Sequence, residues 1–263
     1  RLALVIEDIE KRGAHDVARR ALQYARAVFA YAAVTGRVQH NPASFKASDI
    51  LVSKKRGHFA AIEAKDLPVF LSRLYRNEAR LFRQTQLAME LLLLTFVRTS
   101  ELIEAEWKEF DLAKKQWVIP AKRMKMKRDH IVPLSRQALE ILQELHILNG
   151  HRTYVFTGQR NPKEHMSNGA ILMALDRMGY RGIHTGHGFR ALAMTTIMEE
   201  LGYPHEIPDT QLAHAKGDDV RRAYDRTKFL SQRQKMMQEW ADYIDRLASN
   251  GEVIVGRFDK AAS

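Results

Sequence analysis

The chain has 263 residues, enough for one large domain or two small ones with a substantial core. Its 42 lysines and arginines outnumber its 31 acidic residues and give a formal net charge of +11, which favours a polyanionic partner, above all nucleic acid. Cysteine is absent, which excludes disulfides, thiolate metal sites and cysteine nucleophiles, and the sequence carries neither an 18-residue apolar run nor a secretion signal.

The first predicted element is a long amphipathic helix that ends near Gly36. Its apolar residues recur at spacings of three and four: Val17, Ala21, Leu22, Ala25, Val28, Phe29 and Ala32. Polar residues such as Arg26 are expected on the opposite face. Residues 39–66 then contain Pro42 and no sustained period, which indicates a linker and a domain boundary.

Helical patterns return after the linker. Asp66 is expected to cap a helix that runs through Leu74, and "ARLFRQTQLAMELLLLTFVRTSELIEAEW" predicts two further helical segments hinged near Arg98. The apolar run "MELLLLTF" within it is predicted to be buried.

The period changes in the middle of the chain. Three short segments, near Phe110–Leu112, Trp117–Pro120 and His130–Leu134, are separated by lysine-rich turns and predict a small antiparallel meander. The expected fold class is therefore mainly α with a small antiparallel β-sheet (α+β).

The remainder of the chain is predicted to be helical again. Ser135 is a good N-cap for the helix "RQALEILQELHIL". Later helix starts are expected near Ser167, His187, Asp209 and Asp218. At the end, Asn250-Gly251 predicts a turn and "EVIVG" a short strand.

Five places carry side chains suited to chemistry, and each also has an ordinary structural explanation. Arg98 and Glu101 are three residues apart and could form an ion pair on one helical face. Lys125 lies in "AKRMKMKRDH", where a basic turn is usually only solvated charge. His187 and Arg190, at the head of a predicted helix, could be a capping histidine and a surface arginine.

The remaining two places are His214 in "QLAHAKGDD", which could be a core histidine, and Tyr224 in "DDVRRAYDRTKF", which could be an aromatic anchor. Two arginines, a lysine, two histidines and a tyrosine together suit one reaction, the attack of a phenol on a phosphodiester. Arginine stays charged and can hold two phosphate oxygens at once. A histidine can help a tyrosine lose its proton, and a lysine can protonate the leaving 5′-oxygen.

The order of these residues resembles that of the tyrosine recombinases, specifically the integrases of phages and genomic islands. The resemblance rests on "VRTSEL", a basic turn leading to "HIVPL", then "HGFR", "LAH" and a later tyrosine, and it extends from about Lys65 to Tyr243. The segment "RAVFAYAAVTGRVQHNPA" is similar to the last helix of the family's core-binding domain.

The resemblance implies which residues hold the substrate. Arg98 and Arg190 would clamp the scissile phosphate, and Glu101 matches the acidic position that braces the first arginine. His214 fills a position that is His or Trp in the family and would hold a phosphate oxygen.

The resemblance also assigns the bond-making and proton-transfer roles. Tyr224 would be the nucleophile, assisted by His187 as a general base or hydrogen-bond partner. Lys125 would be the general acid on the β-hairpin, with Lys127 and Arg128 near enough to keep that assignment open. The scheme requires no metal and no other cofactor.

The implied organisation is a partial helical core-binding domain over residues 1–55, a linker over 56–65, a catalytic domain over 66–249 and a C-terminal tail over 250–263. The implied partners are double-stranded DNA attachment sites, three further copies of the chain in a homotetramer on DNA, and accessory DNA-bending and directionality proteins, with no membrane. The work would take place in the bacterial cytoplasm, at the nucleoid. Because the chain begins at Arg1, we expect it to be part of a longer protein.

Three other functions fit parts of the pattern. A type IB topoisomerase uses similar residues to relax DNA through the same kind of phosphotyrosine, but the flanking sequence favours an integrase. A regulator that keeps the fold without cutting DNA would be expected to have a broken catalytic set. A basic helical module with no chemistry would bind DNA without covalent capture.

Overall fold

The computed structural model describes residues 2–51, 60–125, 127–213 and 229–258, with side chains described as far as residue 249. The chain divides into two compact units, Arg1–His58 and Phe59–Ser263. Each unit has its own buried apolar cluster. Among the described residues, no helix combines the length and the apolar character that a membrane crossing requires.

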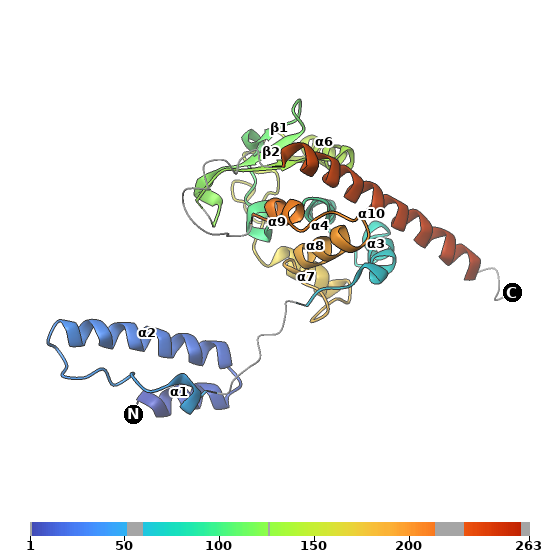
Figure 1. Ribbon diagram of the computed structural model, residues 1–263. Coiled ribbons are helices and arrows are strands. Elements are labelled where there is room, and N and C mark those ends of the chain that lie inside the picture. Colours follow the sequence, from blue (N-terminus) through green and yellow to red (C-terminus); the bar gives the residue numbers. More distant parts are fainter. Residues whose placement is uncertain (1, 52–59, 126, 214–228, 259–263) are drawn as a thin grey trace. The chain divides into compact units, whose positions relative to one another are not determined.

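The first unit is built on two helices, α1 (Leu2–Lys11) and α2 (His15–Val34), which pack against each other (Figure 1). The predicted long helix is therefore confirmed, but its buried face is narrower than expected, because Val17 and Val28 are exposed. Arg26 does not face away from the protein: it donates to the carbonyl oxygens of Ala43, at 3.1 Å, and Phe45.

The start of the predicted linker thus folds back onto the first unit. Ala43 and Leu51 are buried in its core, and a short 3₁₀ turn, η1, spans Ala47–Asp49. Periodicity shows which residues share a face of one helix, but not where the chain runs after that helix ends. The contacts of Arg26 with the returning segment were therefore not predicted.

The second unit is mainly helical. Its α-helices are α3 (Leu67–Tyr75), α4 (Arg83–Thr95), α5 (Thr99–Ile103), α6 (Arg136–Asn149), α7 (Ala170–Arg177), α8 (Gly188–Glu199), α9 (Glu206–Gln211) and α10 (Leu230–Phe258). Among the described residues, short 3₁₀ turns accompany them at η2 (Ala64–Asp66), η3 (Trp107–Glu109) and η4 (Ala121–Arg123).

A three-stranded antiparallel sheet contacts α10 through its last strand (Figure 1). Its strands are β1 (Phe110–Asp111), β2 (Gln116–Ile119) and β3 (His130–Pro133), in the order β1-β2-β3. In the register of the sheet, Trp117 pairs with Phe110 on one side and with Val132 on the other. The predicted meander and the predicted fold class are confirmed.

Helix α4 lies at the centre of the second unit, and all but one of the residues from Thr85 to Thr95 are buried. Helix α10 packs along α3 and also contacts α4, α6, α9 and β3. Its Trp240 indole donates to the Leu93 carbonyl oxygen at 2.9 Å. The predicted burial of "MELLLLTF" is therefore confirmed, and α10 covers the C-terminal end of α4.

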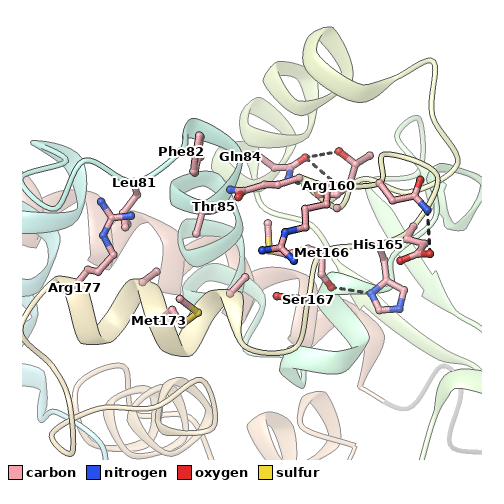
Figure 2. A pocket seen from close by; sticks show the side chains of 17 residues that line it. Leu81, Phe82, Gln84, Thr85, Arg160, His165, Met166, Ser167, Met173 and Arg177 are labelled. Atoms are coloured by element: carbon pink, nitrogen blue, oxygen red, sulfur yellow. Dashed lines mark hydrogen bonds between the residues drawn. The ribbon is translucent and has the colours of Figure 1, made fainter.

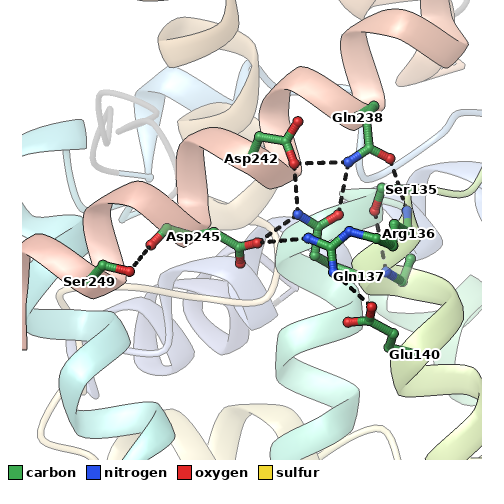
Figure 3. A network of polar contacts seen from close by, with 9 residues as sticks. Ser135, Arg136, Gln137, Glu140, Gln238, Asp242, Asp245 and Ser249 are labelled. Atoms are coloured by element: carbon green, nitrogen blue, oxygen red, sulfur yellow. Dashed lines mark hydrogen bonds and ion pairs between the residues drawn. The ribbon is translucent and has the colours of Figure 1, made fainter.

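A polar network attaches α10 to the start of α6 (Figure 3). The Gln137 amide donates to Asp242, at 2.9 Å, and to Asp245, at 2.7 Å, while Gln238 accepts from the Arg136 backbone N–H at 2.9 Å. As predicted, α6 begins with a side-chain cap at Ser135, whose hydroxyl accepts from the Ala138 backbone N–H.

One predicted cap and one predicted helix start were wrong. Helix α3 begins where predicted, with Asp66 at its N-cap position, but the Asp66 side chain makes no cap hydrogen bond; its carboxylate accepts from the Glu63 N–H at 3.1 Å and closes the preceding turn η2. Asp209 lies inside α9, which begins at Glu206, because Pro208 falls in the first turn, where proline's missing N–H costs little. Asp218 lies outside the described residues.

The predicted turn and strand at the C-terminus are also wrong, since α10 continues through Asn250-Gly251 to Phe258. Each residue added to an existing helix gains a backbone hydrogen bond, whereas an interior glycine costs only about 1 kcal/mol. A short strand with no neighbouring strand to pair with gains no such bonds.

Candidate active site

The candidate site is built at the hinge between α4 and α5. Helix α4 ends at Thr95, and its C-cap residue is Phe96, a fully buried residue with the left-handed backbone angles φ 40° and ψ 34°. A bulky side chain rarely adopts this conformation. The reversal turns the Phe96 carbonyl oxygen into the interior and lets Arg98 begin α5.

Arg98 and Glu101 form the ion pair that their spacing allowed. The Arg98 guanidinium donates to Glu101 Oε1 at 2.6 Å, and the Arg98 backbone N–H donates to Oε2 at 2.8 Å. Glu101 is buried, while the Arg98 side chain keeps about a quarter of its surface exposed, at 23%. The carboxylate therefore fixes one edge of a guanidinium that still reaches solvent.

Arg190 is buried rather than a surface residue, with 4% of its surface exposed. It lies in the first turn of α8 and donates to the carbonyl oxygens of Phe96, at 2.9 Å, and Leu212, at 2.7 Å. Its Nε is buried and has no hydrogen-bond partner among the described residues. A guanidinium held by two carbonyls, with a donor left over, is suited to receive an anion.

The small residues before Arg190 permit close packing at the start of α8. A Cβ on Gly186 would lie 2.4 Å from the Thr99 hydroxyl, and one on Gly188 would lie 2.6 Å from the Ala60 carbonyl oxygen. Glycine therefore lets the start of α8 approach the start of α5, which brings the two arginines into one region.

The two arginines affect each other electrostatically. Burial, together with the nearby charge of Arg98, lowers the pKa of Arg190 to about 10. This pKa still lies above neutral pH, so the Arg190 guanidinium remains charged. Two like charges held close together in a partly dry site favour a bound anion between them.

Three successive carbonyl oxygens, those of Gln211, Leu212 and Ala213, form what we call the carbonyl row. The Gln211 oxygen lies 2.9 Å from His130 Nε2, on β3. The Leu212 oxygen accepts from Arg190, and the Ala213 oxygen accepts from Arg98 at 3.3 Å. The segment immediately before position 214 therefore contacts β3, α8 and α5.

Lys125 lies on the turn between β2 and β3, and its side chain is exposed. The root of the same turn is anchored by Arg123, which donates to the buried Glu109 carboxylate and, at 3.0 Å, to the Glu101 carbonyl oxygen. The turn is thus attached to the residue that braces Arg98.

The structure brings together Arg98, Glu101 and Arg190. His187 occupies the N-cap position of α8, and its side chain makes no cap hydrogen bond, so the capping explanation does not hold. His214 and Tyr224 lie outside the described residues. In the part of the chain that is described, no group of three or more His, Asp or Glu side chains is arranged to hold a metal ion.

Sequence reasoning missed a set of interior polar residues beside these arginines: Glu109, Arg123, His130, Gln211 and Arg233. One signal was available for Arg233, because it precedes Met236, Met237 and Trp240 at helical spacing and therefore lies on the apolar face of its helix. Burying a charge on such a face costs free energy, so a charged residue there indicates a specific role.

A separate cavity of about 520 Å³ lies between α4, α7 and the 157–167 loop (Figure 2). Gln84, His165 and Arg177 are among its lining residues, and none of the predicted site residues is. The Gln84 amide oxygen accepts from the Asn149 side chain and from the Thr157 backbone N–H, so this side chain ties the loop to α4 and α6. The cavity is distinct from the arginine site.

Comparison with known proteins matches both units. Residues 67–230 match the phage integrase family, and residues 1–46 match the phage integrase central domain. The integrase of Enterobacteria phage P4 is 39% identical, over 91% of this chain and 57% of that protein. Prophage integrase IntA of Escherichia coli K12 is 34% identical, over 98% of this chain and 62% of that protein. The chain thus spans 57% and 62% of these two relatives.

Solved structures share the fold at low sequence identity. Lambda integrase, in a dimer bound to a core site, matches with a TM-score of 0.62 and 18% identity, over 83% of this chain and 79% of that one. The Tn1549 transposon integrase, in complex with a circular intermediate DNA, matches with a TM-score of 0.57 and 16% identity, over 86% of this chain and 84% of that one. With the family match covering the unit that holds both arginines, the chain belongs to the phage integrase family.

Proposed function

We propose that this protein cuts and rejoins DNA at specific sites through a covalent 3′-phosphotyrosine, and so integrates or excises a mobile element. The observation that carries the proposal is the convergence of Arg98 and Arg190 on neighbouring carbonyls of the carbonyl row, directly before His214 in the sequence. Two fixed guanidiniums suit the charge that builds on phosphate oxygens during attack.

In the proposed step, the Tyr224 phenol oxygen attacks the scissile phosphorus, and its proton passes to His187. A bond forms between the tyrosine oxygen and phosphorus, and the bond to the 5′-oxygen breaks. Lys125 supplies the proton that the leaving 5′-oxygen takes up. Arg98, Arg190 and His214 hold the non-bridging oxygens, and Glu101 keeps Arg98 in place.

The reaction conserves a phosphodiester bond, because the phosphotyrosine is itself a phosphodiester. A 5′-hydroxyl from another strand can therefore attack it and release Tyr224 without an external energy source. Strand exchange of this kind needs two DNA duplexes, and one structural neighbour is a lambda integrase tetramer bound to a Holliday junction. We propose the same stoichiometry here, with four copies of the chain acting on attachment sites in the bacterial cytoplasm.

We extend the proposal to the two units of the chain. Residues 1–55 would act as part of a core-binding domain, residues 66–249 would carry the catalysis, and residues 56–65 would join them. A domain on each side of the duplex would let the protein grip the DNA, and accessory DNA-bending and directionality proteins would set the direction of the reaction.

Covalent capture tests the proposal and recovers the target site in the same experiment. Purified protein is incubated with nicked duplex fragments of host and element DNA, in which the short cleaved strand diffuses away and traps the adduct. Sequencing of the trapped DNA should return one shared site, and mass spectrometry should place the nucleotide on the peptide containing Tyr224.

The matched control is Tyr224→Phe, which removes a single oxygen atom. This variant should bind the recovered site as tightly as the wild-type protein and give no adduct. An adduct on another residue, or DNA binding with no adduct in the wild-type protein, would contradict the proposal. Relaxation of supercoiled DNA without strand exchange on paired sites would instead indicate a topoisomerase.

A further inference from the structure

Arg233 is a buried cation with no role in the proposed chemistry. It lies in the first turn of α10 with 1% of its surface exposed, and burial lowers its pKa to about 10. Its Nη1 donates to the Ile131 carbonyl oxygen at 2.8 Å and to Gln211 Oε1 at 3.0 Å. Among the described residues, no carboxylate pairs with it, and its Nε has no partner.

A buried charge of this kind lowers stability unless it is compensated. Removing a guanidinium from water has a large free-energy cost, and neutral carbonyl acceptors return only part of it. Its helical neighbours Met236 and Met237 are buried apolar residues, so an apolar side chain at position 233 would suit the local packing. The charge therefore indicates a requirement other than stability.

The contacts of Arg233 lie next to the carbonyl row. Gln211, whose side chain accepts from Arg233, is the first residue of the row, and its backbone oxygen contacts His130. Ile131, the second acceptor, follows His130 on β3. One nitrogen of Arg233 thus connects the row to the strand that follows the Lys125 turn.

We propose that Arg233 is a positioning residue, which holds Gln211 against β3 and thereby fixes the Leu212 and Ala213 carbonyls that orient Arg190 and Arg98. The arginines are then aligned before DNA arrives, and less of the binding energy is used to order them. This inference rests on the proposed function, because in that function the aligned arginines hold the scissile phosphate.

A first test needs no DNA. In the ¹⁵N-labelled chain of residues 1–263, the side-chain N–H signals of Arg98 and Arg190 report the geometry of their hydrogen bonds. Arg233→Met should shift both sets of signals. Arg233→Lys, which keeps the charge and one donor nitrogen, should shift them less. Arg73→Lys is the matched control, because Arg73 lies on α3 and donates to Met178.

The same spectra can overturn the inference. Unchanged Arg98 and Arg190 signals in a folded Arg233→Met protein would show that Arg233 does not position them. If Arg233→Met does not fold, Gln211→Met removes the acceptor and leaves the cation in place, and it should give the same shifts. Circular dichroism melts establish which variants are folded.

A second test uses the site recovered by covalent capture. Single-turnover cleavage by Arg233→Met should fall by about 10- to 100-fold on a normal phosphodiester, with DNA affinity unchanged. On a methylphosphonate, in which a methyl group replaces one charged oxygen, the loss should be much smaller, because oriented guanidiniums matter less for a neutral group. Arg233→Lys should recover part of the rate.

Equal losses on both substrates would show that Arg233 only maintains the amount of folded enzyme, and would overturn the inference. The absence of cleavage by the wild-type protein would count against the proposed function instead. In that case the arginine signals still decide whether Arg233 positions Arg98 and Arg190.

Discussion

Arg190 donates to the carbonyl oxygen of Phe96 at 2.9 Å, across 94 positions of the chain. The acceptor is available only because Phe96 adopts a left-handed backbone at the end of α4. The Phe96 ring contacts Trp240 of α10 edge-to-face, with centroids 6.5 Å apart. One buried side chain therefore maintains both the hinge and the orientation of an arginine.

Phe96→Ala should lower the free energy of unfolding by about 3–5 kcal/mol, because it removes a fully buried aromatic ring and leaves a cavity under α10. Denaturant titration measures the change. Phe82→Ala is the matched control and should have little effect, since Phe82 is 63% exposed. A loss for Phe96→Ala no larger than that of the control would show that the ring does not support the hinge.

Lys125→Ala should slow cleavage by about 10²–10⁴-fold and leave DNA affinity within a few-fold, as expected on loss of a general acid. Replacing the leaving 5′-oxygen with sulfur should restore the rate, because a thiolate leaves without a proton. If Lys127→Ala or Arg128→Ala shows the larger, sulfur-rescued defect, the general acid lies at that position instead.

Arg123→Met should destabilise the fold by about 3–5 kcal/mol, because it leaves the Glu109 carboxylate buried without its cation. Trp117 still donates to that carboxylate at 3.0 Å, so the double variant with Glu109→Gln should recover part of the loss. Arg136→Met breaks exposed pairs with Glu140 and Asp245 and should cost at most about 1 kcal/mol. Thermal or denaturant unfolding of all three variants separates the buried pair from the exposed ones.

The free energy of unfolding should fall as pH rises, because the buried Glu90 carboxyl loses its proton. Burial raises the pKa of this carboxyl to about 7, against an ordinary value near 4.5, although Arg83 opposes the shift from 3.7 Å. Between these two pH values the folded state binds more protons than the unfolded state, so the stability present below pH 4.5 is lost as pH approaches 7.

The expected size of this loss is on the order of 1–3 kcal/mol. Glu90→Gln should remove the decline, and Glu140→Gln, at an exposed position, should leave it in place. Unfolding free energies measured from pH 4.5 to 8 test this. An unchanged slope in Glu90→Gln would assign the effect to other groups.

Local patterns predicted much of the fold. The hinge near Arg98, the cap at Ser135 and the three short strands all depend on neighbours within a few positions, which the sequence displays directly. The C-terminal helix was missed for the opposite reason, since "EVIVG" has a strand-like composition while the helix before it continues to Phe258. There, continuation of the helix outweighs local propensity.

The sequence pointed to individual residues of the candidate site, but not to the buried contacts that support them. The spacing of Arg98 and Glu101 suggested their ion pair, and the resemblance suggested Arg190. The contacts of Arg233 with Ile131 and Gln211 join segments 102 and 22 positions away, and no periodicity encodes them. For the same reason the burial of Arg190, which its carbonyl partners permit, was not expected.

The carbonyl row also bears on how the sequence can change over evolution. A main-chain oxygen is present in every amino acid, so exchanging Leu212 or Ala213 for a residue of similar size leaves the acceptors for Arg190 and Arg98 in place. An insertion or deletion within residues 211–213 would displace the acceptors from their donors in a single event. Related chains should therefore vary in the identity of these residues while their number stays constant.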